Sequence, residues 1–355
     1  MRDIKLDSIK GILMLLTVFG HALELVPSGT GSALYRIIYS FHMPAFLFIS
    51  GYLARWNPRK LVRFYLPLFL FSQLFYLVFD FVSTGSSSSL PFGFLTPYWH
   101  LWYLAVLILC KLTLPLLSKV SGKGETAVFV CTVLLSLLFP LIRMNVYFLS
   151  LGRFFAFLPF FTVGYFCKRE KSTLPNLALG VPFSIIFTLS CDRVTLKMLY
   201  GSFAYSDITD MAVRAALIFF AFGWISLFFD LPAKEGILTF IGKNTLPTYI
   251  LHGFFMRVMK LTGVGVKNEI TALLIALALC LSLSSLENFS NINVKIIYNR
   301  IKQILHLKTV KIERKEQNGK RNNSTRFYIK KSKRRKRVAL LVQRKKGSTL
   351  FLPEG

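Results

Sequence analysis

Three histidines stand inside long apolar stretches of the sequence, where an ionisable side chain is costly. Counted as helix rise from a basic residue at one end of each stretch, they lie at similar depths: about 16 Å for His21, about 20 Å for His42 and about 14 Å for His252. Imidazole is the side chain best suited to take a proton from a hydroxyl near neutral pH. The spacing therefore predicts that the three rings meet in one layer and act on a hydroxyl, unless they only hydrogen-bond neighbouring helices for packing.

Three charged residues share the stretch that carries His21. Lys10 precedes it by eleven residues, and eleven steps of about 100° return to nearly the same helix face. Glu24 follows His21 by one turn and can either orient the ring or lie solvated near the surface. Asp7 stands three residues before Lys10, either as a helix-end ion pair or in a catalytic or ligand-binding role. All three are therefore candidates to assist His21.

A basic cluster follows the second stretch and consists of Arg55, Arg59, Lys60 and Arg63. The excess of Lys and Arg in cytoplasmic loops of membrane proteins accounts for most of it. Guanidinium groups also bind phosphate through two parallel hydrogen bonds. The cluster is therefore also a candidate site for a phosphate-rich ligand.

Several other polar and aromatic residues have ordinary explanations. Lys111, inside the fourth stretch, is expected to extend along its helix toward the surface. Trp99, His100 and Trp102 stand at the outer edge of that stretch, where aromatic belts are common. The five cysteines show no CxxC or Cys/His spacing, so we expect buried thiols, no metal site and no disulfide framework.

The composition indicates which fold can position these residues. Of 355 residues, 54% are hydrophobic, 17% are charged and 35 are Phe, which excludes a soluble globular enzyme. Apolar runs near 20 residues, enough to cross a hydrocarbon layer about 30 Å thick, recur along the chain. We expect an all-α integral membrane protein with about ten transmembrane helices in a bundle. The expected spans are residues 9–27, 34–54, 64–82, 99–118, 126–142, 153–167, 177–190, 211–230, 244–261 and 270–286.

The loops between these spans differ in basic charge, which predicts their orientation. Loops 28–33 and 83–98 contain no Lys or Arg, whereas the alternate loops in the first half are basic. The bias weakens later, since Arg193, Lys197 and Lys267 would lie outside. The pattern predicts that the N-terminus and the C-terminal tail are cytoplasmic.

The chain changes character near residue 288. Residues 288–355 hold 20 Lys and Arg against 3 Asp and Glu, out of 44 and 16 in the whole chain. We therefore expect a membrane domain, 1–287, and a polybasic tail, 288–355, that is too basic to fold on its own and is disordered. The tail can bind anionic lipids, bind nucleic acid, or be an unrelated extension without a selected role. The abrupt change of composition favours the last.

Several motifs follow one another in the order typical of one family. They are residues 7–12 (DSIKGI) with 19–21 (FGH), 41–52 (FHMPAFLFISGY), 63–67 (RFYLP), 101–104 (LWYL), Arg153 before 158–161 (LPFF) and 164–165 (GY), and 241–252 (IGKNTLPTYILH). On these motifs, which extend over about residues 1–287, the chain resembles the acyltransferase-3 family of integral-membrane O-acyltransferases, in particular its fucose 4-O-acetylase-like branch.

The resemblance implies a ten-helix bundle in the bacterial cytoplasmic membrane. Such a protein transfers an acyl group, usually acetyl from acetyl-CoA, to a sugar hydroxyl of a cell-surface polysaccharide or a lipid-linked glycan precursor. The resemblance also implies that His21 is the catalytic histidine, paired along its helix with Lys10. Many relatives carry Arg at the Lys10 position, and Lys keeps the charge but loses the planar fork. His42 and Arg63 match other signature positions of the family.

These implications assign provisional roles to the candidate residues. Arg55, Arg59 and Arg63 are expected to bind the phosphates of acetyl-CoA. His21 would act as general base on the acceptor hydroxyl or would itself carry the acetyl group, and the sequence leaves both open. Lys10 and His42 complete the expected catalytic set. The residues expected to bind the acceptor or the donor carbonyl are Asp7, Glu24, Trp102, Arg153, Asn244, Tyr249 and His252.

Two other functions fit the same composition. A transporter, for example an exporter of a lipid-linked sugar, also contains buried charge near the middle of the membrane, but residues 1–140 and 150–286 show no inverted repeat. A catalytically silent scaffold would not need the motif residues that the chain retains. The expected partners are a glycan or lipid-linked sugar and membrane lipids rather than nucleic acid, and the oligomeric state, a homo-oligomer included, stays open.

Overall fold

The computed structural model describes residues 3–27, 29, 32–84, 95–142, 148–170, 177–195 and 205–286. Every regular element in these residues is helical, which confirms the all-α class. The polybasic tail, 288–355, lies outside the described residues, as do Lys197 and parts of the loops expected at 28–33 and 83–98.

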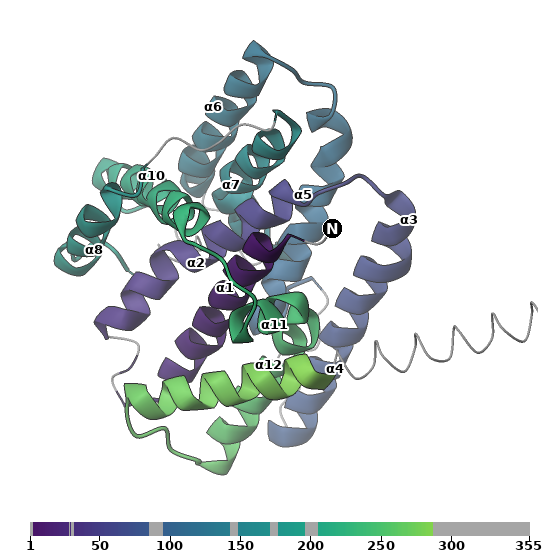
Figure 1. Cartoon of the computed structure of the whole chain (residues 1–355), viewed down its shortest axis with the longest axis vertical. Helices are drawn as coiled ribbons and strands as arrows, with labels where there is room; N and C mark the ends of the chain where they lie inside the picture. Colours follow the sequence, from purple (N-terminus) through teal and green to yellow (C-terminus); the bar gives the residue numbers. More distant parts are fainter. Residues whose placement is uncertain are drawn as a thin grey trace, which may run out of the picture. The chain divides into compact units, whose positions relative to one another are not determined.

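Each of the ten expected ranges overlaps a helix of the structure, and the order along the chain is the expected one (Figure 1). They are α1 (Ile4–Leu23), α2 (Ala33–Tyr52), α3 (Pro58–Lys60), α4 (Leu66–Thr84), α5 (Trp102–Leu117), α6 (Lys123–Leu138), α7 (Leu151–Glu170), α8 (Gly180–Ser190), α10 (Ile208–Asp230), α11 (Ile237–Lys243), α12 (Thr245–Thr262) and a last helix, Glu269–Leu286. Among the described residues, seven helical segments are long and apolar enough to cross a membrane. The helices α2 and α12 are long enough but less apolar, and α8 has only 11 residues.

Helix α1 lies in the middle of the bundle, with α2 beside it (Figure 1), and it also packs against α11 and α12. It begins at Asp3, whose carboxylate accepts hydrogen bonds from the backbone N–H groups of Lys5 and Leu6. In the most apolar 18-residue stretch of α1, 78% of the residues are buried. In the corresponding stretch of the segment that contains α6, 11% are buried. The helix that carries Lys10 and His21 is therefore an internal one, and α6 is peripheral.

At each of two helix crossings, a pair of glycines allows the backbones of the two helices to touch. A Cβ atom on Gly11 of α1 would lie 1.9 Å from the Leu238 carbonyl oxygen of α11, and one on Gly242 would lie 1.7 Å from the Asp7 carbonyl oxygen. The short helix α11 was not expected from the sequence. Small residues allow such close approach between helices in membranes, so this pair fixes α11 against the Lys10 end of α1.

The same arrangement joins α2 to α7. A Cβ atom on Gly51 would lie 2.0 Å from the Phe161 carbonyl oxygen, and one on Gly164 would lie 2.0 Å from the Phe48 carbonyl oxygen. This crossing holds α2, which carries His42, in a fixed position against the core.

Aromatic rings fill the core around these crossings. Trp102 of α5 stacks on Phe157 of α7 with ring centroids 5.4 Å apart, and Phe160 contacts Phe222 of α10 at 4.9 Å. Other large apolar side chains face outward, such as Phe71 of α4, which is 71% exposed. Such a surface suits hydrocarbon rather than water.

We predict that Gly51→Ala destabilises the protein, because the new methyl group would collide with a backbone oxygen that cannot move by itself. The expected loss is about 1–3 kcal/mol or more of unfolding free energy. Thermal unfolding of the detergent-purified protein, followed by helical circular dichroism, measures the effect. The matched control is Gly180→Ala, since a Cβ at Gly180 meets nothing within 4 Å. Equal melting temperatures for the two variants would contradict this account of the crossing.

Candidate active site

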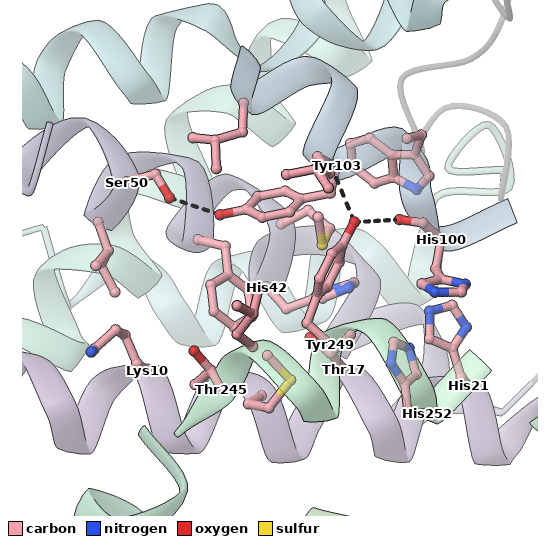
Figure 2. Close-up of a pocket in the computed structure, with 18 of the residues that line it drawn as sticks. Lys10, Thr17, His21, His42, Ser50, His100, Tyr103, Thr245, Tyr249 and His252 are labelled. Carbon is pink, nitrogen blue, oxygen red and sulfur yellow. Dashed lines mark hydrogen bonds between the residues drawn. The ribbon is translucent and has the colours of Figure 1, made fainter. Parts of the chain in front are cut away.

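A cavity of about 200 Å³ lies between α1, α2, α5 and α12. Four histidines line it, and each is at most 7% exposed: His21, His42, His100 and His252. Figure 2 shows His21, His100 and His252 gathered at one end and Lys10 at the other. The cavity thus brings together the three histidines that the sequence predicted to meet, and adds a fourth.

His21 lies in the last turn of α1 and contacts a carboxylate. Its Nδ1 is 3.0 Å from Oε1 of Glu24, whose side chain is only 22% exposed. The Tyr39 hydroxyl donates to the same oxygen at 2.9 Å and lies 3.1 Å from the His21 Nδ1. A proton on Nδ1 can be donated to the carboxylate, which leaves the Nε2 lone pair for chemistry. The geometry favours an orienting role for Glu24 over a solvated one.

The rings of His100 and His252 lie beside His21 and are held by backbone carbonyls. His252 Nδ1 lies 2.8 Å from the Thr248 carbonyl oxygen, and His100 Nε2 lies 3.2 Å from that of Ile250. A carbonyl can only accept, so these nitrogens carry the protons and the opposite nitrogens are acceptors. Within the described residues, His252 Nε2 and His100 Nδ1 are buried without a hydrogen-bond partner. Both are therefore acceptors that a ligand's O–H or N–H can satisfy.

His42 is oriented in the same way by its own helix. Its Nδ1 donates to the Ile38 carbonyl at 2.7 Å, and its ring meets Tyr39 edge-on at 4.8 Å. Tyr39 thereby stands between His42 and His21, whose ring centroid lies 6.1 Å from that of Tyr39. The two histidines are connected through this tyrosine.

Sequence reasoning missed the position of His100 and Tyr39 in the lining of the cavity. His100 was interpreted as part of an aromatic belt, yet its centroid lies 4.9 Å from that of His252. A Cβ at Gly253 would lie 2.3 Å from the His100 ring, so this glycine leaves room for it. Tyr39 gave no signal, because its contact with Glu24 depends on the packing of two helices.

Asp7 and Lys10 form the helix-end ion pair that was one of the two expectations. Lys10 Nζ lies 2.6 Å from Asp7 Oδ1, and the Asp7 side chain is buried. Lys10 lines the cavity, whereas Asp7 is not among its lining residues. The charge of Lys10 is thus kept at the end of the cavity away from His21.

Tyr249 and Trp102 line the cavity, and Arg153 and Asn244 do not. The Tyr249 hydroxyl donates to the His100 carbonyl at 3.1 Å and accepts from the Leu104 N–H at 3.2 Å, which ties α12 to the start of α5. The Arg153 guanidinium lies 4.8 Å from the centre of the Trp102 ring. Arg153 therefore contacts a residue that lines the cavity without lining the cavity itself.

Asn244 belongs to the junction between α11 and α12. Its Nδ2 donates to the Phe240 carbonyl at 3.0 Å, and its own carbonyl accepts from the Ser284 hydroxyl at 3.2 Å. Asn244 fastens the last helix to the start of α12. It lies four residues before Thr248, whose carbonyl orients His252.

A second hollow, of about 240 Å³, adjoins the cavity and is cationic. Arg55, Lys60 and Lys111 line it, and it shares Leu53 and Tyr65 with the cavity. Lys111, expected only to extend toward the surface, points its ammonium at the Tyr65 ring, 5.0 Å from the centre. We call this hollow the cationic pocket. Arg59 and Arg63, expected beside Arg55, are exposed and are not among its lining residues.

Comparisons with known proteins agree with the motifs. The model of the acyltransferase-3 family, described as an acyltransferase domain, matches residues 3–286. Nodulation protein NolL of Sinorhizobium fredii (strain NBRC 101917 / NGR234) is 33% identical over 180 residues, which are 44% of this chain and 49% of the relative. In that match the chain spans about half the length of the relative.

Nodulation protein NolL of Mesorhizobium japonicum (strain LMG 29417 / CECT 9101 / MAFF 303099) is 24% identical over 300 residues, which are 74% of this chain and 79% of the relative. No solved structure matches the chain significantly. Because the family model extends over nearly the whole helical part, the chain belongs to the acyltransferase-3 family of membrane proteins.

Proposed function

We propose that this acyltransferase moves an acetyl group from acetyl-CoA to a sugar hydroxyl of a cell-surface polysaccharide or a lipid-linked glycan precursor. The observation that carries the proposal is the pairing of His21 with the Glu24 carboxylate inside a cavity that leads to cationic side chains. The cavity has a base at one end and a phosphate-binding surface near the other. This arrangement suits a donor that carries a thioester at one end and phosphate groups at the other. Because the chain belongs to an acyltransferase family, we do not propose an exporter.

The donor fits the cavity and the cationic pocket by its chemistry. Arg55, Lys60 and Lys111 offer positive charge to its phosphates. The walls of the cavity between there and His21 are mostly apolar and suit the narrow arm that carries the thioester. Lys10 stands eleven residues from His21, about 16 Å of helix rise, so we assign it to the donor's approach rather than to the acetyl group.

In the proposed reaction, His21 acts as general base. Its Nε2 takes the proton of the acceptor hydroxyl while the hydroxyl oxygen attacks the thioester carbonyl carbon. Glu24 stabilises the positive ring, because its carboxylate accepts the Nδ1 proton. The C–S bond then breaks, the coenzyme A thiolate leaves, and the proton on Nε2 neutralises it. An acetyl group carried by His21 would use the same nitrogen, and trapping an acetylated enzyme would distinguish that route.

We assign the other histidines to positioning. His252 Nε2 and His100 Nδ1 can accept hydrogen bonds from the acceptor hydroxyl or from amide groups of the donor. His42 reaches His21 through Tyr39 and supports the orientation of that pair. Tyr249 keeps α12 and α5 at the spacing that this arrangement needs.

We further propose a multi-pass protein of the bacterial cytoplasmic membrane. The end of α1 that carries Lys10 would face the cytoplasm, where acetyl-CoA is made, as would the tail from residue 288. The Lys and Arg bias of the loops supports this orientation. The division into a membrane domain, 1–287, and a tail, 288–355, is part of the same proposal.

We predict that His21→Ala lowers kcat for acetyl transfer by about 10²–10⁴-fold, the usual contribution of a positioned base. The KM for acetyl-CoA should change little, because the donor's phosphates bind at the other end of the cavity. Transfer of radiolabelled acetate from acetyl-CoA to deacetylated glycan in membranes measures both constants. The control is His306→Ala, which removes the histidine of the tail. Unchanged turnover by His21→Ala protein would remove this residue from the mechanism.

We predict that Arg55→Ala combined with Lys60→Ala weakens acetyl-CoA binding at least tenfold, since a hydrogen bond to a charged group contributes about 1.5–3 kcal/mol. Arg59→Ala, outside the cationic pocket, should change the Kd by less than threefold. Equilibrium binding of labelled coenzyme A to purified protein gives the values, with exposed Lys119→Ala as the charge-matched control. An equal loss for Arg59→Ala would show that phosphate binding follows the whole cluster instead.

A further inference from the structure

A third pocket, of about 340 Å³, lies at the other end of α1 from Lys10. Its lining includes His21, Glu24, Asp80, Tyr98, Trp99 and Arg257, from α1, α4, α12 and the segment before α5. We call it the Trp99 pocket. His21 also lines the central cavity, so its ring stands between the two hollows.

A hydrogen-bonded ion pair forms one side of the Trp99 pocket. Arg257 of α12 donates through Nε and Nη2 to Oδ1 of Asp80 of α4, at 3.1 and 2.7 Å. The Tyr98 hydroxyl donates to the same oxygen at 3.3 Å. Burial and the neighbouring Asp80 carboxylate raise the pKa of Tyr98 to about 12, so the hydroxyl remains a donor. Donors and acceptors held together in this way match the hydroxyl groups of a sugar, each of which donates and accepts.

An aromatic ring forms the side nearest the base. Trp99 meets His21 edge-on, with ring centroids 4.7 Å apart. The segment that carries it is held on α4 by Gln73, which accepts from the Tyr98 N–H at 2.8 Å and donates to the Thr96 carbonyl at 3.0 Å. Indole offers a broad apolar face together with a polar N–H, and the C–H edges of a pyranose ring pack on such a face.

The charges of the Trp99 pocket are balanced, unlike those of the cationic pocket. Glu24 and Asp80 oppose Arg257 and Lys260 along its walls. The residues that line the cationic pocket include no acid. A phosphate-rich molecule therefore suits the cationic pocket, and a ligand rich in neutral hydroxyls suits the Trp99 pocket.

Building on the proposed acetyl transfer, we propose that the Trp99 pocket is the acceptor site. A pyranose ring packs against Trp99, its hydroxyls hydrogen-bond the Asp80–Arg257 pair, and one hydroxyl reaches His21 Nε2, where it meets the thioester carbonyl that arrives through the central cavity. Acceptor and donor then approach the same imidazole from separate hollows.

The test separates acceptor binding from donor binding. We would purify the full-length protein in detergent and supply labelled acetyl-CoA together with the producing cell's own surface glycan, deacetylated by mild alkali. Trp99→Ala and Asp80→Asn should each raise the KM for this glycan at least tenfold. Both should leave the KM for acetyl-CoA within twofold of its starting value.

A second variant distinguishes sugar binding by the Asp80–Arg257 pair from a purely structural role of that pair. The exchange variant Asp80→Arg/Arg257→Asp retains a pair between α4 and α12 but reverses its donors and acceptors. If the pair only joins helices, the exchange variant should return the glycan KM, which Asp80→Asn raises, to its starting value. If the pair binds sugar, the glycan KM of the exchange variant should stay raised. Glu235→Gln is the matched control, because it breaks an exposed pair with Lys243 that has an N–O distance of 3.2 Å.

The outcomes distinguish this inference from the proposed function. An unchanged glycan KM for Trp99→Ala, or its recovery in the exchange variant, would overturn the acceptor site while acetyl transfer itself stands. A starting protein that binds acetyl-CoA but transfers no acetate to the glycan would overturn the proposed function, and the acceptor site with it.

Discussion

The contact between His21 Nδ1 and the Glu24 carboxylate is the interaction on which the rest of the site depends. It decides which nitrogen of the ring is free, and the Tyr39 hydroxyl binds the same carboxylate from α2. The register of α1 against α2 is therefore part of the chemistry. Gly20 contributes to it, because a Cβ at that position would lie 3.0 Å from the Tyr39 ring. The close packing of α1 against α2 is therefore needed to orient the base, His21.

The helices also orient the other imidazoles without help from further side chains. His42 and His252 each donate Nδ1–H to the carbonyl four residues earlier, an oxygen that also belongs to the helix hydrogen-bond ladder. Their second nitrogens are consequently acceptors, and within the described residues that of His252 is buried without a hydrogen-bond partner. A buried acceptor without a partner costs about 1–3 kcal/mol, and a ligand that donates to it recovers that free energy. The arrangement thus keeps part of the binding energy available for the substrate.

Features that depend on spacing along one helix could be predicted from the sequence. Apolar run length locates the helices, and depth counting brings His21, His42 and His252 together. Features that depend on contacts between helices could not. The neighbours of His100 arise from the room that Gly253 leaves. Arg55 lines the cationic pocket and Arg59 does not, a difference that depends on how the segment after α2 packs. The tail from residue 288 lies outside the described residues.

Under the proposed function, the position of His21 between two hollows limits what has to cross the protein. A phosphorylated donor would lose much hydration if it passed through an apolar bundle, and so would a polar sugar. An acetyl group is small and uncharged, so its transfer from donor to acceptor beside one imidazole costs far less. The cationic pocket can then hold the donor's charge at one end while the Trp99 pocket holds the acceptor at the other. The same base serves both, because His21 Nε2 takes the proton of the acceptor hydroxyl and then gives it to the coenzyme A thiolate, at the one point where the two hollows meet.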